Sequence, residues 1–464
     1  MEVLKESFWP NSQPEFCAVK RDYSQYEGTA VSSDELDRLC CPEELVPSVL
    51  ELLADAETRV QQIDRVPASK MTVDRFNDEF DRRNVPVLLE NATAGWKCMQ
   101  CWTTDSQSGG RKVNVQYLSR EYGTAKATLS NCSFQEWETT SVQEGVTVAK
   151  FLQSLDATEV EADVSRHFSV QEAVQEVYGA FQQHRSRAYY LRDLTLFRQC
   201  KSAMREFDLP AVFADDWFNA HCDREMLAED YRFVYLGAKD SYTPMHHDVM
   251  RSHSWSSNVF GTKLWIMLPP CDKHLLMDST NTHMISNLFH VDWPSVNTTV
   301  PRLQGDTQPH FLMAREALRR AVVFVQRAGD AVFVPSGWYH QVHNVGSITA
   351  SINHNWVSRF CADLVFAHWY DALRFRVFPA TYHRTAEEEE VPDEVWRQCD
   401  TALCGEAGFD AWRIAALVET GLSSSRAAVL DDEFARKFRD MQRVVREARI
   451  FHLPALHGHS VPRS

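Results

Sequence analysis

The spacing of apolar side chains changes several times along the chain, and each spacing predicts a type of element. Helical spacing over Met71–Asn84 predicts an amphipathic helix, and the apolar run Val85–Leu89 predicts a buried strand after it. Ser169, with Glu172 three residues later, matches a capping box and predicts the start of a further helix. A short strand is expected over Ala188–Leu191. The first part of the chain therefore mixes helices with isolated strands.

Residues 231–358 read as short β segments separated by tight turns. Turn residues at Gly261-Thr262 and at Arg327–Asp330 predict two hairpins. A run of β segments that closes on itself predicts a barrel or a two-sheet sandwich. The expected strands are Arg232–Leu236, Asn258–Phe260, Leu264–Leu268, Val322–Gln326, Ala331–Val334 and Ile348–Val357.

Helical patterns flank this β-rich region on both sides, so we expect an α+β protein with a mainly β core. Single helices are predicted over Leu45–Leu53 and, at helical spacing of apolar residues, over Phe434–Val445. The expected parts are a loosely structured leader over residues 1–60, a helical and strand region that packs on the barrel over 61–187, the β domain over 188–358 and a helical region over 359–464.

The chain of 464 residues carries 48 basic and 64 acidic residues, a formal net charge of −16. This balance argues against direct binding to nucleic acid, because proteins that bind the phosphate backbone usually carry a basic surface. It fits a basic protein partner, although solubility alone explains the same charge. Apolar runs of about eighteen residues are absent from the sequence, so we expect no membrane span.

The first residues lack the basic stub and apolar core of a secretory signal. The 12 cysteines show no framework spacing, so we expect reduced thiols and a location in the cytosol, with the nucleus as a second compartment. Cys98 and Cys101 form half of a zinc-site pattern. A second pair at a suitable spacing does not follow in the sequence, and we expect no structural zinc there.

Candidate chemistry concentrates in the segment Met245–Val249. In an extended segment, residues two apart point to the same face, so His246 and Asp248 point together while His247 points away. One further imidazole would complete a 2-His-1-carboxylate triad, which leaves positions of an octahedral iron open for a chelating co-substrate and oxygen.

Two histidines in the segment Pro335–His343 are candidates for the third ligand. His340 follows turn residues and enters the next strand, which suits a ligand at a barrel mouth. His343 is separated from His340 by an odd number of residues and would face the opposite side of that strand. We therefore favour His340.

Lys263 is the only charged residue in the otherwise apolar run up to Leu268. A buried lysine needs an anionic partner, and a ligand carboxylate deep in the barrel would supply one. Thr243, three residues before His246, could donate its hydroxyl to the same carboxylate. The alternative is a strand-end lysine whose ammonium extends outward to water.

Four sequence blocks together resemble the JmjC (Jumonji-C) domain family. Their order, spacing and chemistry agree with this family, most strongly over residues 188–358. The blocks are His246-x-Asp248, Ser254–Pro270, Gly329–His340 and Ser351–Trp356.

The resemblance implies a double-stranded β-helix, the jelly-roll or cupin-like barrel of JmjC proteins, that binds iron(II) through His246, Asp248 and His340. It implies that Lys263 and Thr243 bind the distal carboxylate of the co-substrate 2-oxoglutarate, with O2 as the oxidant. Tyr190 lies where related oxygenases place a tyrosine on that carboxylate. Asn355 matches an asparagine near the metal, and we group it with the cofactor-binding residues.

Within the JmjC family, the amino-acid sequence of these blocks is most similar to that of lysyl hydroxylases that act on a translation termination factor. The resemblance therefore implies a 2-oxoglutarate-dependent dioxygenase that hydroxylates a protein side chain, with lysine favoured. Two alternatives stay open at this point: a JmjC histone lysine demethylase, and a catalytically silent cupin-like binding protein. The oligomeric state cannot be derived from the sequence.

Overall fold

A computed structural model gives the fold of the described part of the chain. Statements about structure below refer to these residues, which include the expected β domain and much of its flanks. They are residues 21–23, 25, 62–106, 109–132, 141–182, 188–224, 231–289, 311–377, 393–407, 409–423, 436, 439 and 440.

Most of the described strands belong to one continuous sheet. Its order is β1-β2-β12-β10-β13-β8-β7-β5-β6, with β11 paired to β10 and β9 paired to β13. The sheet strands are β1 (Asp64–Pro67), β2 (Val87–Glu90), β5 (Lys126–Asn131), β6 (Ser141–Thr147), β7 (Tyr189–Leu194), β8 (Arg232–Gly237), β9 (Tyr242–His246), β10 (His253–Leu268), β11 (Val322–Gln326), β12 (Ala331–Val334) and β13 (Tyr339–Trp356). A separate two-stranded sheet contains β3 (Thr103–Asp105) and β4 (Arg111–Val113).

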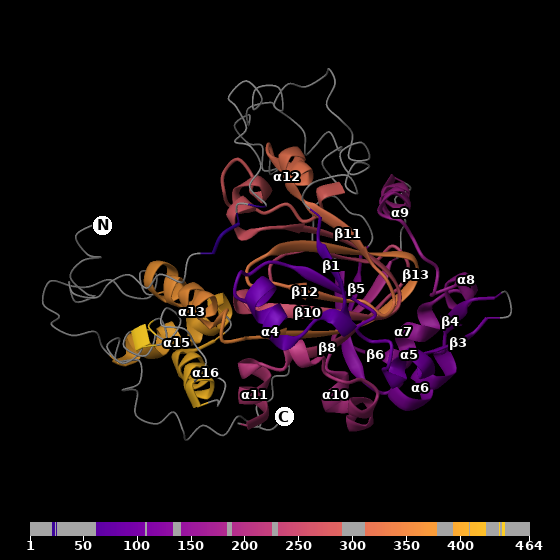
Figure 1. Ribbon diagram of the computed structural model, residues 1–464, viewed down its shortest axis with the longest axis horizontal. Helices are drawn as coiled ribbons and strands as arrows, with labels where there is room; N and C mark the ends of the chain where they lie inside the picture. Colours follow the sequence, from indigo (N-terminus) through magenta and orange to yellow (C-terminus); the bar gives the residue numbers. More distant parts are fainter. Residues whose placement is uncertain are drawn as a thin grey trace, which may run out of the picture.

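The long strands β10 and β13 fold this sheet into two facing layers. Residues 253–258 of β10 pair with β12 and with the end of β13, and residues 262–268 pair with β11 and with the start of β13. The first layer therefore holds the first half of β10, the second half of β13, β12, β8 and β7. The second layer holds β11, β9 and the remaining halves of β10 and β13. This arrangement is the expected jelly-roll barrel (Figure 1).

The hairpin predicted at Gly261-Thr262 is wrong. The chain continues through these residues as the single strand β10, and the pairing register with β13 shifts on both sides of Phe260. Gly261 takes a φ of 78°, and a Cβ there would lie 2.6 Å from the carbonyl oxygen of Ile348. A β-bulge and a hairpin turn both favour glycine, so residue type alone did not separate them.

The second predicted turn, Arg327–Asp330, is present but does not form a hairpin. The strands on either side of it, β11 and β12, do not pair with each other in the described sheet. They pair with successive parts of β10, so that the turn connects the two layers.

Helices on the N-terminal side follow the predicted pattern closely. The helix expected over Met71–Asn84 forms α4 (Val73–Phe76) and continues as the π-helical turn η4 (Asn77–Asp81). The capping box predicted at Ser169 starts α9 (Val170–Gln182): the backbone N–H of Glu172 donates to Ser169 Oγ at 3.2 Å, and Glu172 Oε2 accepts from the N–H of Ser169 at 2.8 Å. The other helices here are α5 (Lys97–Cys101), α6 (Val115–Tyr122), α7 (Val148–Ser154), α8 (Ala157–Glu161), α10 (Leu196–Gln199) and α11 (Trp217–Arg224).

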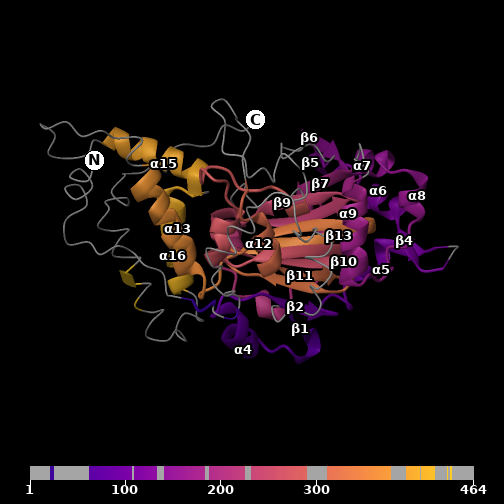
Figure 2. The same ribbon diagram turned by 90° about the horizontal axis from the view of Figure 1, so that it is seen from above.

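The C-terminal helices lie at the opposite side of the barrel from α5, α6 and α8 (Figures 1 and 2). They are α13 (Ala362–Asp371), its π-helical continuation η10 (Ala372–Val377), α15 (Asp393–Ala407) and α16 (Ala411–Ser423), while α12 (Ala314–Arg320) precedes β11. The predicted helix Leu45–Leu53 lies outside the described residues, as does almost all of Phe434–Val445.

Two leader residues are anchored to the barrel. The buried guanidinium of Arg21 donates to both carboxylate oxygens of Asp363 on α13, at 3.1 and 2.9 Å. The ring of Tyr23 meets Trp338 edge-on, with centroids 6.3 Å apart. Part of the N-terminal region therefore joins the barrel to the C-terminal helices.

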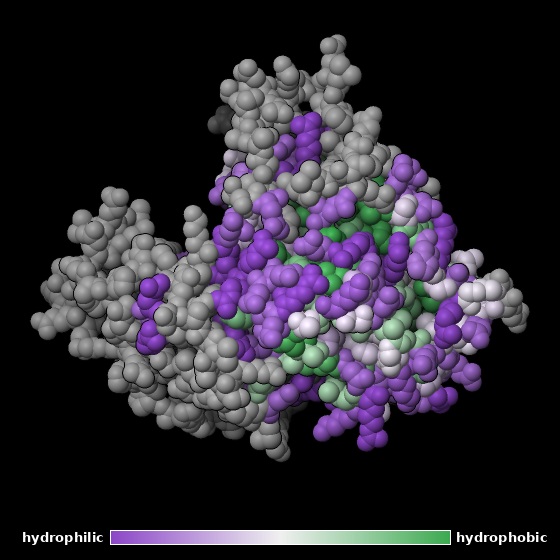
Figure 3. Space-filling model, viewed as in Figure 1, coloured by the Kyte–Doolittle hydropathy of each residue, from purple (hydrophilic) through white to green (hydrophobic). Residues whose placement is uncertain are grey.

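Tryptophans fill the barrel and its surroundings. Trp255, Trp265, Trp338 and Trp356 are all buried. On the face shown in Figure 3, hydrophilic residues cover most of the described surface, and hydrophobic residues show in small areas between them. Among the described helices, none is both long enough and apolar enough to cross a membrane.

Candidate metal and co-substrate site

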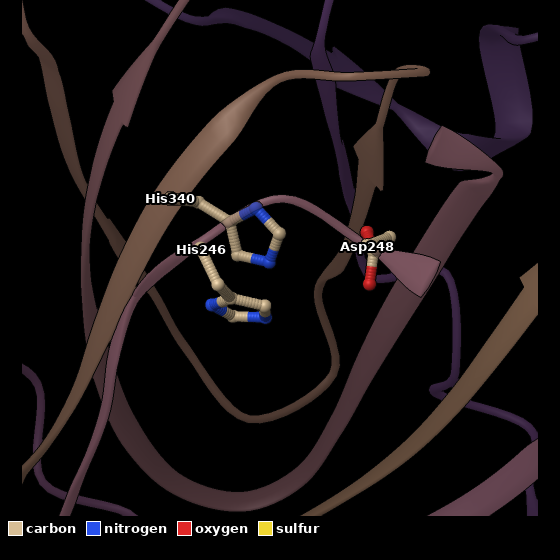
Figure 4. Close-up of side chains that lie close together, drawn as sticks. All are labelled: His246, Asp248 and His340. Atoms are coloured by element: carbon tan, nitrogen blue, oxygen red, sulfur yellow. The ribbon is translucent and has the colours of Figure 1, made fainter. Parts of the chain in front are cut away.

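The three predicted metal ligands converge at one end of the barrel. His246 is the last residue of β9, and His340, the second residue of β13, is its direct cross-strand partner. Asp248 follows β9 after one intervening residue. One ligand atom from each side chain lies within 4.8 Å of the others, and the three point toward a common centre (Figure 4).

Backbone carbonyls orient both imidazoles. The Nδ1 atom of His246 lies 2.8 Å from the carbonyl oxygen of Pro244, and Nδ1 of His340 lies 3.2 Å from that of Trp338. A protonated Nδ1 that donates to a carbonyl leaves the Nε2 lone pair available for a metal. Burial and the neighbouring His246 lower the pKa of His340 to about 4, so its ring is neutral near pH 7, the form that binds metals.

The carboxylate of Asp248 is held by the other layer of the barrel. Ser254 on β10 donates its hydroxyl to Oδ2 at 2.7 Å, and the amide of Asn355 on β13 donates to Oδ1 at 2.9 Å. Burial alone would raise the pKa of Asp248, but the two imidazoles and these hydrogen bonds together bring it below its usual value. The ligand set therefore lies between the two layers of the barrel. The histidines belong to the second layer, and the residues that hydrogen-bond to the Asp248 carboxylate belong to the first.

The remaining histidines of the two motifs point elsewhere. His247 lies against Tyr339, with ring centroids 5.5 Å apart, and its Nδ1 is 2.9 Å from the carbonyl oxygen of Asp248. His343 stacks on Tyr242 at 5.1 Å, on the side of the strand away from the triad. Two imidazoles and one carboxylate on one face are the donor set typical of non-haem iron(II) oxygenases, so the residues present fit that metal.

Lys263 is enclosed in the barrel. Its side chain is 1% exposed, which excludes the alternative of an ammonium extended to water. Its Nζ donates to the hydroxyl of Ser351 in the opposite layer at 2.6 Å, and within the described residues it forms no ion pair. Burial lowers the pKa of Lys263 to about 7. A buried ammonium with one neutral partner fits an anionic ligand.

Tyr190 and Thr243 lie beside this lysine. The hydroxyl of Tyr190 hydrogen-bonds with Thr243 and with Asn344, and Asn344 is the cross-strand partner of Lys263. Burial raises the pKa of Tyr190 to about 12, so its hydroxyl stays protonated and can donate. The structure thus brings together the three residues expected at a distal carboxylate.

Asn355 does not lie with Lys263, Thr243 and Tyr190 in the co-substrate pocket. Its amide contacts the candidate metal ligand Asp248 instead. Sequence reasoning also missed Ser254, Ser351 and Asn344. A signal existed for two of them. Polar residues at every second position, in Ser254-x-Ser256 and in Ser351-x-Asn353-x-Asn355, mark the faces of β10 and β13 that line the barrel.

Comparison with known proteins identifies the family. Residues 73–362 match the model of the Cupin-like domain. The 2-oxoglutarate and iron-dependent oxygenase JMJD4 of Gallus gallus is 30% identical over 73% of this chain and 68% of its own length. This chain belongs to the cupin-like JmjC oxygenase family. The matched range begins well before residue 188, in keeping with the strands β2, β5 and β6 that extend the first layer.

Other members of the JmjC family match over similar lengths. JMJD4 of Danio rerio is 29% identical over 80% of this chain and 76% of its own length. A protein of Arabidopsis thaliana named arginine-specific demethylase JMJ20 is 26% identical over 76% of this chain and 68% of its own length.

The chain is therefore a 2-oxoglutarate-dependent dioxygenase that uses iron and 2-oxoglutarate. When bound, these groups activate O2 for oxidation of a substrate carbon, chemistry that the protein itself does not supply. The arrangement of His246, Asp248 and His340 would hold the metal, and Lys263, Thr243 and Tyr190 would hold the distal carboxylate.

Affinity for 2-oxoglutarate should fall as pH rises above about 7. In the empty site the pKa of Lys263 is about 7, and a bound carboxylate raises it because it favours the ammonium form. Below pH 7 the lysine is already charged, so the affinity for 2-oxoglutarate does not change with pH. Above pH 7 binding must take up a proton, so affinity should drop by up to about tenfold per pH unit. Isothermal titration from pH 6 to 9 measures this, and Lys263→Arg, whose charge persists, should show no such slope.

Removing the Asn355 amide should weaken metal binding without abolishing it. Asn355→Ala takes away one of the two hydrogen bonds that orient Asp248, and loss of such a partner typically costs about 10–100-fold in metal affinity. Because Ser254 keeps its contact, we expect about tenfold. Titration of the metal-free protein with Fe(II) under anaerobic conditions tests this. An unchanged affinity would show that Ser254 alone suffices.

Proposed function

We propose that this oxygenase hydroxylates a lysine side chain in a protein substrate. The chemistry of iron and 2-oxoglutarate is common to the family and does not choose the substrate. The observation that carries the proposal is a strip of aromatic side chains next to the site, formed by Phe233 and Tyr235 on β8 and by Tyr231 immediately before it.

The position of this strip follows from strand pairing. Phe233 and Tyr235 are direct partners of Asn353 and Ser351 on β13, and cross-strand partners share a face. That face carries the Ser351 hydroxyl that meets Lys263 and the Asn355 amide that meets Asp248. The aromatic strip therefore borders both the metal ligands and the co-substrate pocket.

The rings follow one another without a gap. Centroids are 6.5 Å apart between Tyr231 and Phe233, 6.4 Å between Phe233 and Tyr235, and 5.8 Å between Tyr235 and Tyr190. The rings of Tyr231, Phe233 and Tyr235 are only partly buried. Aromatic faces attract cations and pack against methylene chains, so this strip suits a long aliphatic side chain with a positive end.

A carboxylate stands at one end of the strip. Asp193 has a φ of 56° where the pairing of β7 and β8 shifts register, and its Oδ1 accepts a hydrogen bond from the Tyr235 hydroxyl at 3.0 Å. The Asp193 side chain is exposed and could pair with a lysine ammonium. Aromatic rings would hold the methylene groups while the acid holds the charged end.

The first protein substrate to test is a translation termination factor, on sequence resemblance alone. The acidic balance of the chain favours a basic partner, and a cytosolic location, with the nucleus as a second compartment, fits such a substrate. Demethylation is the second candidate, because one relative is named an arginine-specific demethylase. Both reactions need the same metal centre, and their products distinguish them.

The decisive experiment incubates the enzyme, Fe(II) and 2-oxoglutarate with the termination factor and with lysine-rich peptides. Hydroxylation leaves one added oxygen on a lysine, seen by tandem mass spectrometry. Demethylation of methylated arginine or lysine peptides instead removes carbon and releases formaldehyde. Asp193→Asn should reduce turnover of lysine substrates by about tenfold, through loss of a charge-assisted contact, and leave 2-oxoglutarate affinity unchanged. Formaldehyde release without stable oxygen addition would replace the proposal with demethylation.

A further inference from the structure

A second group of polar side chains lies on the other side of the metal ligands, where the turn after Asp248 meets α13. We name His247, Arg251, Lys273 and His368 the basic cluster. Arg251 ends the short helix η7 (Val249–Arg251), Lys273 lies on η8 (Pro270–Leu276) and His368 on α13. The rings of His247 and His368 meet edge-on, with centroids 6.1 Å apart.

Arg251 is fixed in place by its backbone. It has a φ of 53°, a conformation that residues other than glycine rarely adopt. Its N–H donates to the carbonyl oxygen of Asp248 at 3.0 Å, and its own carbonyl oxygen accepts from the Ser336 hydroxyl. Strain of this kind clusters at functional sites, because the surrounding structure must maintain it.

The side chain of Arg251 lacks an acidic partner. Its Nε is buried and without a hydrogen bond, and among the described residues Arg251 forms no ion pair. The stem lies next to Gly337, where a Cβ would be 3.7 Å from Cδ of Arg251, and the guanidinium hydrogen-bonds with the neutral hydroxyl of Tyr339. An arginine held in one conformation, with a neutral partner and its Nε–H unused, is suited to an anion.

The surroundings are electropositive although the chain is acidic overall. Burial lowers the pKa of His368 to about 3, and the positive side chains of Arg251, Arg376 and Lys273 contribute to this lowering. The two imidazoles of the cluster are neutral near pH 7, so Arg251 and Lys273 supply its charge. The acid next to Lys273 in sequence, Asp272, pairs with Arg320 at 3.1 Å. A carboxylate from a partner would therefore enter a site of complementary charge.

We propose that the basic cluster binds an aspartate or glutamate side chain of the protein substrate, close in sequence to the residue that is oxidised. His247 lies between the ligands His246 and Asp248, so the cluster is next to the metal centre. An extended peptide advances about 3.3 Å per residue, so an acid that reaches the cluster lies near the target residue in the substrate sequence. The inference rests on the proposed function only in requiring a protein substrate.

The test uses fluorescein-labelled lysine peptides in matched pairs, with glutamate or glutamine at each position near the lysine, and measures anisotropy with the full-length enzyme. At one position at least, wild type should bind the glutamate peptide about tenfold more tightly than its partner. Arg251→Gln and Lys273→Gln should each reduce this preference. Arg327→Gln, an exposed arginine at the turn between β11 and β12, is the matched control and should retain it.

Equal affinity for both peptides at every position would overturn the inference, as would a preference that survives in Arg251→Gln and Lys273→Gln. Lys273 is exposed, so its variant should fold even if the strained Arg251 position does not tolerate glutamine. Peptides in which leucine replaces the lysine separate the two proposals. A glutamate preference that persists in them supports the basic cluster even where lysine hydroxylation fails.

Discussion

Asp248→Ala should abolish 2-oxoglutarate turnover while leaving the fold largely intact. The change removes the only charged ligand of the triad, and two imidazoles alone hold a divalent metal weakly. Loss of residues that merely orient metal ligands costs about 10–100-fold, so loss of a ligand should exceed about a hundredfold. Succinate release with saturating iron measures the effect, and thermal denaturation checks the fold.

His247→Ala is the control for Asp248→Ala, because His247 lies between two ligands and points away from their centre. Its iron affinity should stay near that of wild type, whereas His246→Ala should lose most of it. Equal damage from the two histidine variants would show that the strand register is wrong. Full activity of Asp248→Ala would reject the triad.

Lys263→Ala should raise the 2-oxoglutarate requirement by roughly thirtyfold or more. Losing one partner of a buried charge pair costs about 2–5 kcal/mol, much of it from the carboxylate left unpaired, and each 1.4 kcal/mol is about tenfold in affinity. The enclosed position of Lys263, with Ser351 as its neutral partner, makes water a poor substitute. Titration of 2-oxoglutarate against initial rate gives the half-saturation.

Two further measurements show that the effect of Lys263→Ala comes from the co-substrate. Iron affinity without 2-oxoglutarate should barely change, because Lys263 is not a ligand. Lys263→Arg should recover only part of the loss, since the guanidinium is longer and planar and the barrel leaves little room. An unchanged half-saturation in Lys263→Ala would move the co-substrate carboxylate to another site.

The sequence by itself determined the candidate set of metal ligands and the type of fold. His246 and Asp248 are local neighbours with the period of an extended segment, and that period does not depend on the rest of the fold. The third candidate, His340, is favoured over His343 because it follows turn residues and enters the next strand. Strands β11 and β12 have the predicted bounds, because short apolar runs between turn residues are a local signal.

The tertiary structure alone decided how distant segments meet. Whether Gly261 bends a long strand or ends a hairpin depends on what pairs with the strand on both sides, which no local pattern contains. The same holds for Ser254 and Asn355, which reach Asp248 only because the folded strands β10 and β13 bring the first layer against the second. The contact between Lys263 and Ser351 likewise depends on the folding of β10 and β13 into two facing layers. Local sequence determines which chemical groups a segment carries, whereas the burial of those groups and their hydrogen-bond partners depend on pairing between residues far apart in the chain.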